Sequence, residues 1–335
     1  MLLKVVFGPA CAPSLRTGIV QRISTLMSQE CPAVDVHVDD FEDGEFLAQI
    51  GSNVRGTDVY VVQPTNQPDR NFSCLLQMLQ AAALGAAAKV TAVLPYCGGL
   101  RGDTKDKPRV AIPAKLMADM ISQAMIAAPH RQVAIVHPHF PQINGFFHGV
   151  PVDRLYPTRE MLGVTHSIVD GDISRLTPTA ADAGGAKLAS LYAMFLDTDA
   201  LAVGDKRRPK NDRPYIRDIV GDIDGRIAMF FEDIVDTART MMQAVMKAKE
   251  KGAIASYLAV THPVLARGAL ENLRIAQEHG LKRVFTTDSI CRTPEEMPDD
   301  LFTVISVGPL IGEAIWRNYT GGSISDIAGA FLESH

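Results

Sequence analysis

Short apolar runs alternate with longer segments of helical character along the whole chain. The runs have the length of buried strands and lie at Leu2–Phe7, Val34–Val38, Val59–Val62, Lys89–Tyr96, Gln132–Val136, Ala200–Val203, Ile227–Phe231, Ala253–His262 and Val284–Ser289. Helices are expected between them, for example over about 13–28 and about 71–88. Strands that alternate with helices predict an α/β fold with mostly parallel sheets covered by helices.

The strand–helix rhythm occurs twice, which indicates two similar domains. A chain of 335 residues is long for one domain and comfortable for two. The segment Pro151–Pro157 is the expected passage between the halves. We therefore predict an N-terminal domain over 1–153 and a C-terminal domain over 154–335, each built on a mostly parallel sheet flanked by helices.

The stretch Arg226–Thr240 places polar side chains directly after a buried strand. The apolar run is expected to end at Phe231 and is followed by Glu232, Asp233, Asp236, Thr237 and Thr240. Open α/β sheets bind ligands at the carboxyl edge of their strands, and the N–H groups at a helix start favour an anion, usually a phosphate. The alternative is that Asp236 is merely the cap of the following helix.

Composition narrows the class of protein. The formal net charge is −5 without a basic block, which argues against nucleic acid as a partner. Five scattered cysteines without a C-x-x-C pair suggest reduced thiols and a cytoplasmic location. No apolar segment approaches the roughly 20 residues of a membrane helix, and the N-terminus lacks the basic region of a signal peptide. No G-x-x-x-x-G-K-[ST] motif occurs, so a Walker-type kinase is not supported.

Several polar segments are ambiguous when each is taken alone. F-E-D-G-E (41–45), the loop 97–107 and the basic segment D-K-R-R-P-K (205–210) are each compatible with a solvated turn or loop. The glycines in A-D-A-G-G (181–185) permit close approach of an anion, but Gly-Gly is usually a turn. His137 and His139 are expected on one face of a strand, without a third ligand for zinc nearby.

Taken together, these segments resemble one enzyme family over almost the whole chain. E-D-I-V-D-T-A-R-T (232–240) is similar to the ribose-phosphate loop of type I phosphoribosyltransferase folds, usually D-D-x-x-D-T-G-G-T. F-E-D-G-E, D-K-R-R-P and H-F-P-Q-I-N-G-F-F (139–147) resemble segments of ribose-phosphate diphosphokinases, also called phosphoribosyl diphosphate synthetases. The resemblance implies two phosphoribosyltransferase type I-like domains.

The resemblance also implies a reaction and the residues for it. The reaction is Mg²⁺-dependent transfer of diphosphate from ATP to the anomeric hydroxyl of ribose 5-phosphate, giving phosphoribosyl diphosphate and AMP for nucleotide biosynthesis. The implied catalytic cations are Lys206 and Arg208. The implied ATP-binding residues are Phe41, Asp43, Glu45, Arg101, Asp103 and His139. The implied ribose-phosphate residues are Asp182, Glu232, Asp233, Asp236, Thr237, Ala238, Arg239 and Thr240, and the implied metal residues are His139 and Asp182.

In the family, the loop that corresponds to Phe41–Glu45 reaches into a neighbouring subunit. The resemblance therefore implies a homo-oligomer, dimer-based with a hexamer as the larger option. The expected partners are ATP and a sugar phosphate, with no nucleic acid and no membrane.

Two departures from the family pattern leave the acceptor open. Ala238-Arg239 replaces the usual Gly-Gly, and Gly102 replaces a Gln. Arg239 either swings out, binds the phosphate directly as a bidentate donor, or adapts the pocket to a 5-substituted acceptor such as ADP-ribose. A catalytically silent regulatory paralogue that binds nucleotides is the alternative from another functional class.

Overall fold

The computed structural model describes residues 2–207 and 214–327, and these form two compact units. The first unit holds the chain up to Pro157, Asp288–Cys291 and the residues from Ser306 on, whereas the second holds Thr158–Thr287 and Arg292–Ile305. This division differs from the expected boundary at 153/154, because the end of the chain returns to the first unit. Its last helix, α8 (Gly308–Thr320), packs on α1 (Pro13–Met27) through a shared apolar core.

The first unit is built on a seven-stranded sheet in the order β3-β2-β1-β4-β5-β6-β7. All neighbours are parallel except β2 and β3, which are antiparallel. The strands are β1 (Leu2–Phe7), β2 (Ala33–Asp40), β3 (Phe46–Ile50), β4 (Thr57–Val62), β5 (Lys89–Leu94), β6 (His130–Val136) and β7 (Val152–Leu155). The apolar runs do not reveal β3 and β7, since one is a partly exposed edge strand and the other has only four residues.

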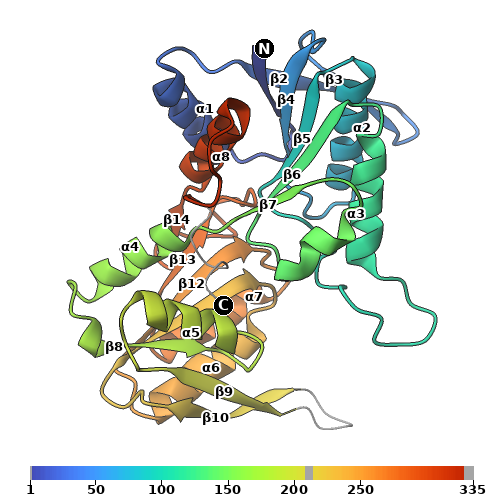
Figure 1. The fold of residues 1–335 in the computed structure, drawn as a ribbon. Helices are drawn as coiled ribbons and strands as arrows, with labels where there is room; N and C mark the ends of the chain where they lie inside the picture. The colour runs from blue at the N-terminus through green and yellow to red at the C-terminus, as the bar shows by residue number, and fades with distance from the viewer. Residues whose placement is uncertain (1, 208–213, 328–335) are drawn as a thin grey trace. The chain divides into compact units, whose positions relative to one another are not determined.

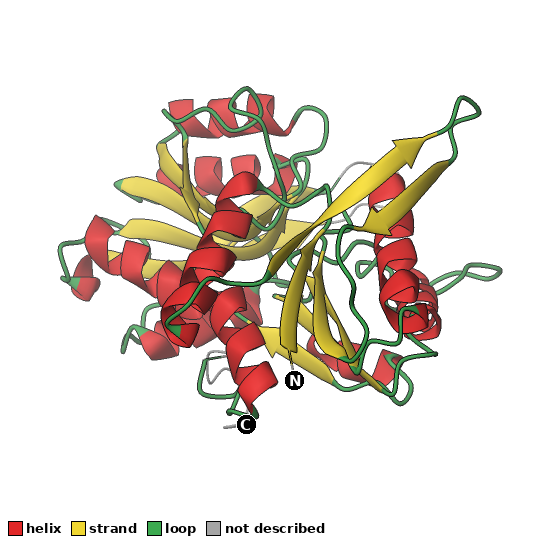
Figure 2. Cartoon of the chain, turned by 90° about the horizontal axis from the view of Figure 1, so that it is seen from above, coloured by secondary structure: helices red, strands yellow, loops and turns green. Residues whose placement is uncertain are grey.

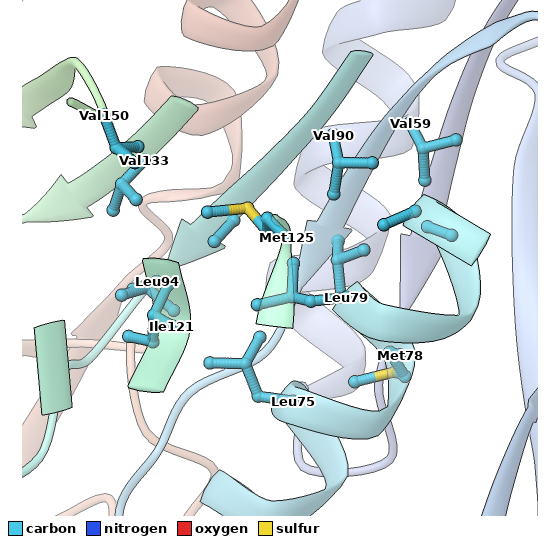
Figure 3. Packing of buried hydrophobic residues seen from close by; sticks show 14 of the residues in the cluster. Val59, Leu75, Met78, Leu79, Val90, Leu94, Ile121, Met125, Val133 and Val150 are labelled. Atoms are coloured by element: carbon cyan, nitrogen blue, oxygen red, sulfur yellow. The ribbon is translucent and has the colours of Figure 1, made fainter. Parts of the chain in front are cut away.

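Helices cover both faces of this sheet. Helices α2 (Arg70–Leu84) and α3 (Pro113–Ala124) bury one face, and Figure 3 shows side chains such as Leu75 and Ile121 packed towards the strands. On the other face α1 and α8 lie side by side (Figure 1). A Cβ on Gly308 would lie 2.7 Å from the carbonyl oxygen of Leu15, so only glycine permits this approach of the helices. A short 3₁₀ helix covers Pro141–Phe146.

The second unit repeats the same strand order, β10-β9-β8-β11-β12-β13-β14, with one antiparallel pair, β9 and β10. The strands are β8 (Leu176–Ala180), β9 (Ala202–Arg207), β10 (Tyr215–Gly221), β11 (Ile227–Val235), β12 (Ala255–Pro263), β13 (Leu281–Thr287) and β14 (Phe302–Ile305). Its helices are α4 (Thr158–Ile168), α5 (Ala186–Phe195), α6 (Arg239–Glu250) and α7 (Ala269–Glu278), with a 3₁₀ turn at Ile173–Arg175. The predicted fold class, two mostly parallel sheets flanked by helices, is confirmed (Figure 2).

The central strand β11 is longer than its apolar run predicts. Its continuous run of buried side chains ends at Phe231, but its backbone pairs with β12 through Glu232↔Val260 as far as Val235↔Pro263. Glu232 and Asp233 therefore lie on the strand rather than after it. The expectation that β11 stops at Phe231 is wrong, because the backbone ladder continues where side-chain burial becomes partial.

Across residues 2–207 and 214–327, no helix is both long and apolar enough to cross a bilayer.

Candidate active site

The carboxyl edge of the second sheet holds a lysine that connects three segments of the chain. The ammonium of Lys206 donates to Asp182 Oδ2 at 2.7 Å and to Thr240 Oγ1 at 3.2 Å. Lys206 comes from β9, Asp182 from the loop after β8, and Thr240 from the first turn of α6. The side chains of Lys206 and Asp182 are only 18% and 26% exposed, so water screens this ion pair less than a surface pair.

The described part of the basic segment, residues 205–207, belongs to β9. Lys206 lies on β9 and pairs with Ile216 of β10, which gives its side chain a fixed origin. The alternative of a solvated loop is wrong for Lys206, because pairing with a strand residue 10 positions further along the chain, which the local sequence does not indicate, holds it in a strand. The second predicted catalytic cation, Arg208, lies outside the described residues.

The loop 181–185 is held tightly against β9. A Cβ on Gly204 would lie 2.1 Å from the carbonyl oxygen of Ala181, so the two backbones are in direct contact. Asp182 Oδ1 accepts from the N–H of Gly184 at 2.9 Å, which folds the loop back on itself before α5 begins. Sequence reasoning missed Gly204, whose only local signal is a glycine inside a strand.

The two acids of β11 have different surroundings. Glu232 Oε1 accepts from the N–H of Ala181 at 3.3 Å. Burial, with the charges of Asp233 and Asp182 nearby, raises the pKa of Glu232 to about 8. Asp233 Oδ1 accepts from the N–H of Ile234 at 2.8 Å. The sequence predicts the same role for both acids, but in the structure they accept hydrogen bonds from different parts of the chain.

The loop before α6 contains a strained residue. Ala238 has φ 57° and ψ 6°, a left-handed conformation, and is buried. It is the N-cap residue of α6, so the alternative that Asp236 caps this helix is wrong. Arg239 is the first helical residue, so Ala238 alone carries the positive φ that glycine usually supplies.

Neighbouring elements hold this loop in shape. The side chain of Asn272 of α7 donates to the carbonyl oxygen of Thr237 at 2.8 Å, and the N–H of Ala266 donates to the carbonyl oxygen of Asp236 at 3.1 Å. No local sequence pattern indicates Asn272, which is 35 residues away from Thr237. Arg239 is exposed and forms no ion pair within the described parts of the chain. The arrangement presents helix N–H groups, two hydroxyl residues and an exposed guanidinium at one edge of the sheet.

In the first unit, the predicted adenine-binding segment is the tip of the β2–β3 hairpin (Figure 1). The N–H of Phe41 donates to the carbonyl oxygen of Glu45 at 2.9 Å, and that of Glu45 donates to Asp43 Oδ1 at 3.0 Å. Gly44, with φ 89°, makes the turn. The ring of Phe41 is 52% exposed. A defined turn therefore presents an aromatic ring and three carboxylates, those of Asp43 and Glu45 among them, to solvent.

The other predicted nucleotide residues follow β5 and β6. Arg101 and Asp103 lie in the long loop before α3, where a Cβ on Gly102 would be 2.7 Å from Pro113 Cδ. Glycine at 102 is thus required by the proline that begins α3. His139 is exposed and follows the end of β6.

The two histidines do not lie on one face of a strand, which corrects that expectation. His137 is buried, has φ 38° and packs edge-on against the ring of Tyr156 at 5.2 Å. The positive φ turns the chain at the end of β6, so the alternation of a strand no longer applies. Among the residues that the structure describes, no three His, Cys, Asp or Glu side chains cluster as metal ligands do.

Comparison with known proteins identifies the family. Residues 4–124 match the N-terminal domain of ribose phosphate pyrophosphokinase, and residues 197–328 match the phosphoribosyl synthetase-associated domain. The ribose-phosphate pyrophosphokinase of Chlorobaculum tepidum is 36% identical over 323 residues, which are 96% of this chain and 94% of that protein. That of Caldanaerobacter subterraneus subsp. tengcongensis is 38% identical over 328 residues and 97% of each chain.

A solved structure agrees with these matches. The crystal structure of phosphoribosylpyrophosphate synthetase from Mycobacterium smegmatis superposes with a TM-score of 0.81 at 26% identity, covering 96% of this chain and 100% of that one. The resemblance inferred from the motifs is thereby confirmed. The chain belongs to the ribose-phosphate pyrophosphokinase family of enzymes.

Proposed function

We propose that this chain transfers diphosphate from ATP to the anomeric hydroxyl of ribose 5-phosphate, in the presence of Mg²⁺, and releases AMP. Family membership supports phosphoribosyl diphosphate synthesis and hence a role in nucleotide biosynthesis. The observation that carries the proposal is the lysine at the sheet edge: Lys206 is bonded to Asp182 and Thr240 between the two loops expected to hold the sugar phosphate.

In this reaction the anomeric oxygen forms a bond to the β-phosphorus of ATP, and the bond from that phosphorus to the α–β bridging oxygen breaks. AMP leaves with the bridging oxygen, and the hydroxyl proton is released. Negative charge spreads over the phosphoryl oxygens as the transfer proceeds. We assign its neutralisation to Lys206 and Arg208, because preorganised cations stabilise developing charge most effectively in a sheltered site.

The sugar phosphate is assigned to the edge of the second sheet. Asp233 accepts hydrogen bonds from the ribose hydroxyls, and Glu232 precedes it on β11. The 5-phosphate binds the start of α6, where helix N–H groups and the positive end of the helix dipole favour an anion. The residues assigned to this phosphate are Asp236, Thr237, Ala238, Arg239 and Thr240.

The nucleotide is assigned to residues of the first unit. The exposed ring of Phe41 suits stacking on adenine, and the carboxylates of Asp43 and Glu45 suit its exocyclic amino group. Arg101, Asp103 and His139 are assigned to the rest of ATP.

We further propose a homo-oligomer, dimer-based with a hexamer as the larger option, in which the Phe41 turn completes the site of a neighbouring copy.

The five cysteines, all of them in the described residues, are free, which supports a reducing, cytoplasmic location.

Mg²⁺ fits the donors of this chain. It is usually held by one or two carboxylates together with substrate phosphates, not by an all-protein cage. The carboxylate of Asp182 is such a donor, and its lysine contact places it beside the proposed phosphate site. His139 is assigned to the outer shell of the ion or to the phosphates, since imidazole nitrogen is a poor direct ligand for Mg²⁺. When bound, Mg²⁺ supplies charge neutralisation to the diphosphate.

A second acceptor is favoured by one observation. Arg239 adds an exposed guanidinium without an ion pair in the described residues, where the family has glycine. A further anionic group on the 5-phosphate, as in ADP-ribose, would pair with it. The silent regulatory paralogue is supported only by the altered loop.

The test offers purified protein ATP and Mg²⁺ with ribose 5-phosphate or ADP-ribose, and measures AMP. AMP with ribose 5-phosphate is the expected result. AMP with ADP-ribose alone would shift the assignment to the second acceptor, and no AMP with either would refute the proposed activity. Sedimentation of the same preparation tests the oligomer, because a monomer that turns over would contradict the shared site.

A further inference from the structure

Glu232 lies at the point where two neighbouring strands separate. Strands β8 and β11 pair in parallel, with Phe230 opposite Thr179 as the last pair. Beyond Ala180 the chain leaves the ladder and forms the loop 181–185. The next N–H, that of Ala181, donates to Glu232 Oε1 at 3.3 Å. The side-chain carboxylate thus takes the place of a ladder carbonyl.

The same carboxylate also reaches the other end of the loop. A Cβ built on Gly185 would lie 3.2 Å from Glu232 Oε1 and 3.5 Å from Oε2. Both oxygens therefore lie on the side of Gly185 from which a side chain would project, directly before α5 begins at Ala186. Glu232 thus accepts a hydrogen bond from the first residue of the loop and lies close to the last.

The loop in turn determines where the lysine charge is held. Asp182 follows Ala181 directly, and its Oδ2 accepts from the ammonium of Lys206 at 2.7 Å. Lys206 also donates to Thr240 at the proposed 5-phosphate site. A displacement of the loop would therefore move Asp182, and with it the ammonium assigned to the transferred phosphoryl group.

We propose that Glu232 is a positioning residue, whose side-chain carboxyl group holds the loop 181–185 against β11 and so places Asp182 and Lys206. The inference rests on the proposed function for its consequence in the reaction. It extends that function by assigning different roles to the two adjacent acids of β11. Asp233 accepts from the sugar hydroxyls, whereas Glu232 acts through the loop.

The first experiment measures hydrogen exchange in the protein without substrate, by mass spectrometry of peptides that cover residues 179–188. Glu232→Ala removes the acceptor of the Ala181 N–H, so exchange in this peptide should rise roughly tenfold, since local opening tracks the lost bond. Glu232→Gln keeps an amide oxygen of the same reach and should exchange like the parent protein. As a matched control, Glu296→Ala removes another carboxylate that accepts a backbone N–H in the same unit, from Thr293 at 2.9 Å, and should leave the peptide unchanged.

Unchanged exchange in Glu232→Ala would overturn the inference. A rise that spreads equally over β8, β9 and β11 would also overturn it, because that pattern reports a general loss of packing. This experiment needs no turnover, so it decides the role of Glu232 in the loop even where the proposed activity fails.

The second experiment separates positioning from contact with the sugar. The loss in kcat/KM caused by Glu232→Ala is measured with ribose 5-phosphate and with its 2-deoxy and 3-deoxy analogues. A positioning residue gives the same loss with every acceptor, roughly 10- to 100-fold, because a displacement of about 1 Å costs that much. A loss that disappears with one deoxy analogue would show a direct hydroxyl contact and overturn the inference.

Discussion

The contact between β9 and the loop 181–185 makes Gly204→Ala a direct perturbation of the lysine site. A Cβ at this position would lie 2.1 Å from the carbonyl oxygen of Ala181, whereas real Cβ contacts essentially never fall below 3.0 Å. The difference, 3.0 − 2.1, requires a shift of at least 0.9 Å. The opposing atom is backbone, so no side-chain rotation relieves the clash, and the strand or the loop must move.

This shift should affect both the reaction and the stability. Lys206 lies two residues after Gly204 on β9 and donates a hydrogen bond to Asp182 of the loop 181–185. A shift between this strand and this loop therefore changes the distance between Lys206 and Asp182 directly. A misplacement of about 1 Å can cost roughly 100-fold in rate, and we expect kcat to fall by about that factor. Overpacking of this kind costs about 1–3 kcal/mol in the free energy of unfolding.

The assay is the initial rate of AMP formation at saturating ATP and acceptor, together with denaturant unfolding. Gly163→Ala is the matched control, because a Cβ at Gly163 of α4 meets nothing within 4 Å. Alanine is also the better helix former by about 1 kcal/mol. The control should keep its kcat and gain slight stability. A Gly204→Ala protein with kcat within about twofold of the parent and an unchanged unfolding midpoint would refute the reasoning.

Three further predictions follow from the site. Lys206→Ala should lower kcat at least 100-fold, as loss of one preorganised donor does. The control variant Lys251→Ala removes a surface ion pair with Asp218 and should leave AMP formation unchanged. Equal rates of AMP formation in both variants would contradict the catalytic assignment of Lys206. Arg239→Gly should raise the KM for ribose 5-phosphate about tenfold, the order expected for one charged hydrogen bond, and a KM that does not change would show that the guanidinium points away from the acceptor. Glu232 has a pKa of about 8 in the folded protein against its ordinary 4.5, so the folded state binds one proton more than the unfolded state between these values. Stability should therefore decrease as pH rises through this window, and urea unfolding in metal-free buffer at pH 5.5, 6.5 and 7.5 should show that decrease in the parent protein but less of it in Glu232→Gln; parallel curves would contradict the raised pKa.

The sequence by itself determined the fold class and the family. The apolar run Leu2–Phe7 became a largely buried strand with the predicted bounds, and other runs became strands whose ends differ by a few residues, because the requirement to bury side chains on both faces is local and visible in the chain. The motif at 232–240 indicated a polar sheet edge followed by a helix, although the strand continues to Val235 and the helix already begins at Arg239. Turn residues likewise marked the hairpin tip at 41–45.

Only the tertiary structure decided how the acids and cations of the site are used. Glu232 accepts a hydrogen bond from Ala181, 51 positions away, and Lys206 donates one to Thr240, 34 positions away. No local pattern encodes either contact. The length of β11 and the strand position of Lys206 depend on pairing partners, not on apolar residues of their own. The return of α8 to the first unit depends on an apolar face that fits α1. The left-handed Ala238 arises because neighbouring strands and helices hold the loop, and the folded structure imposes the backbone conformation that glycine would adopt alone.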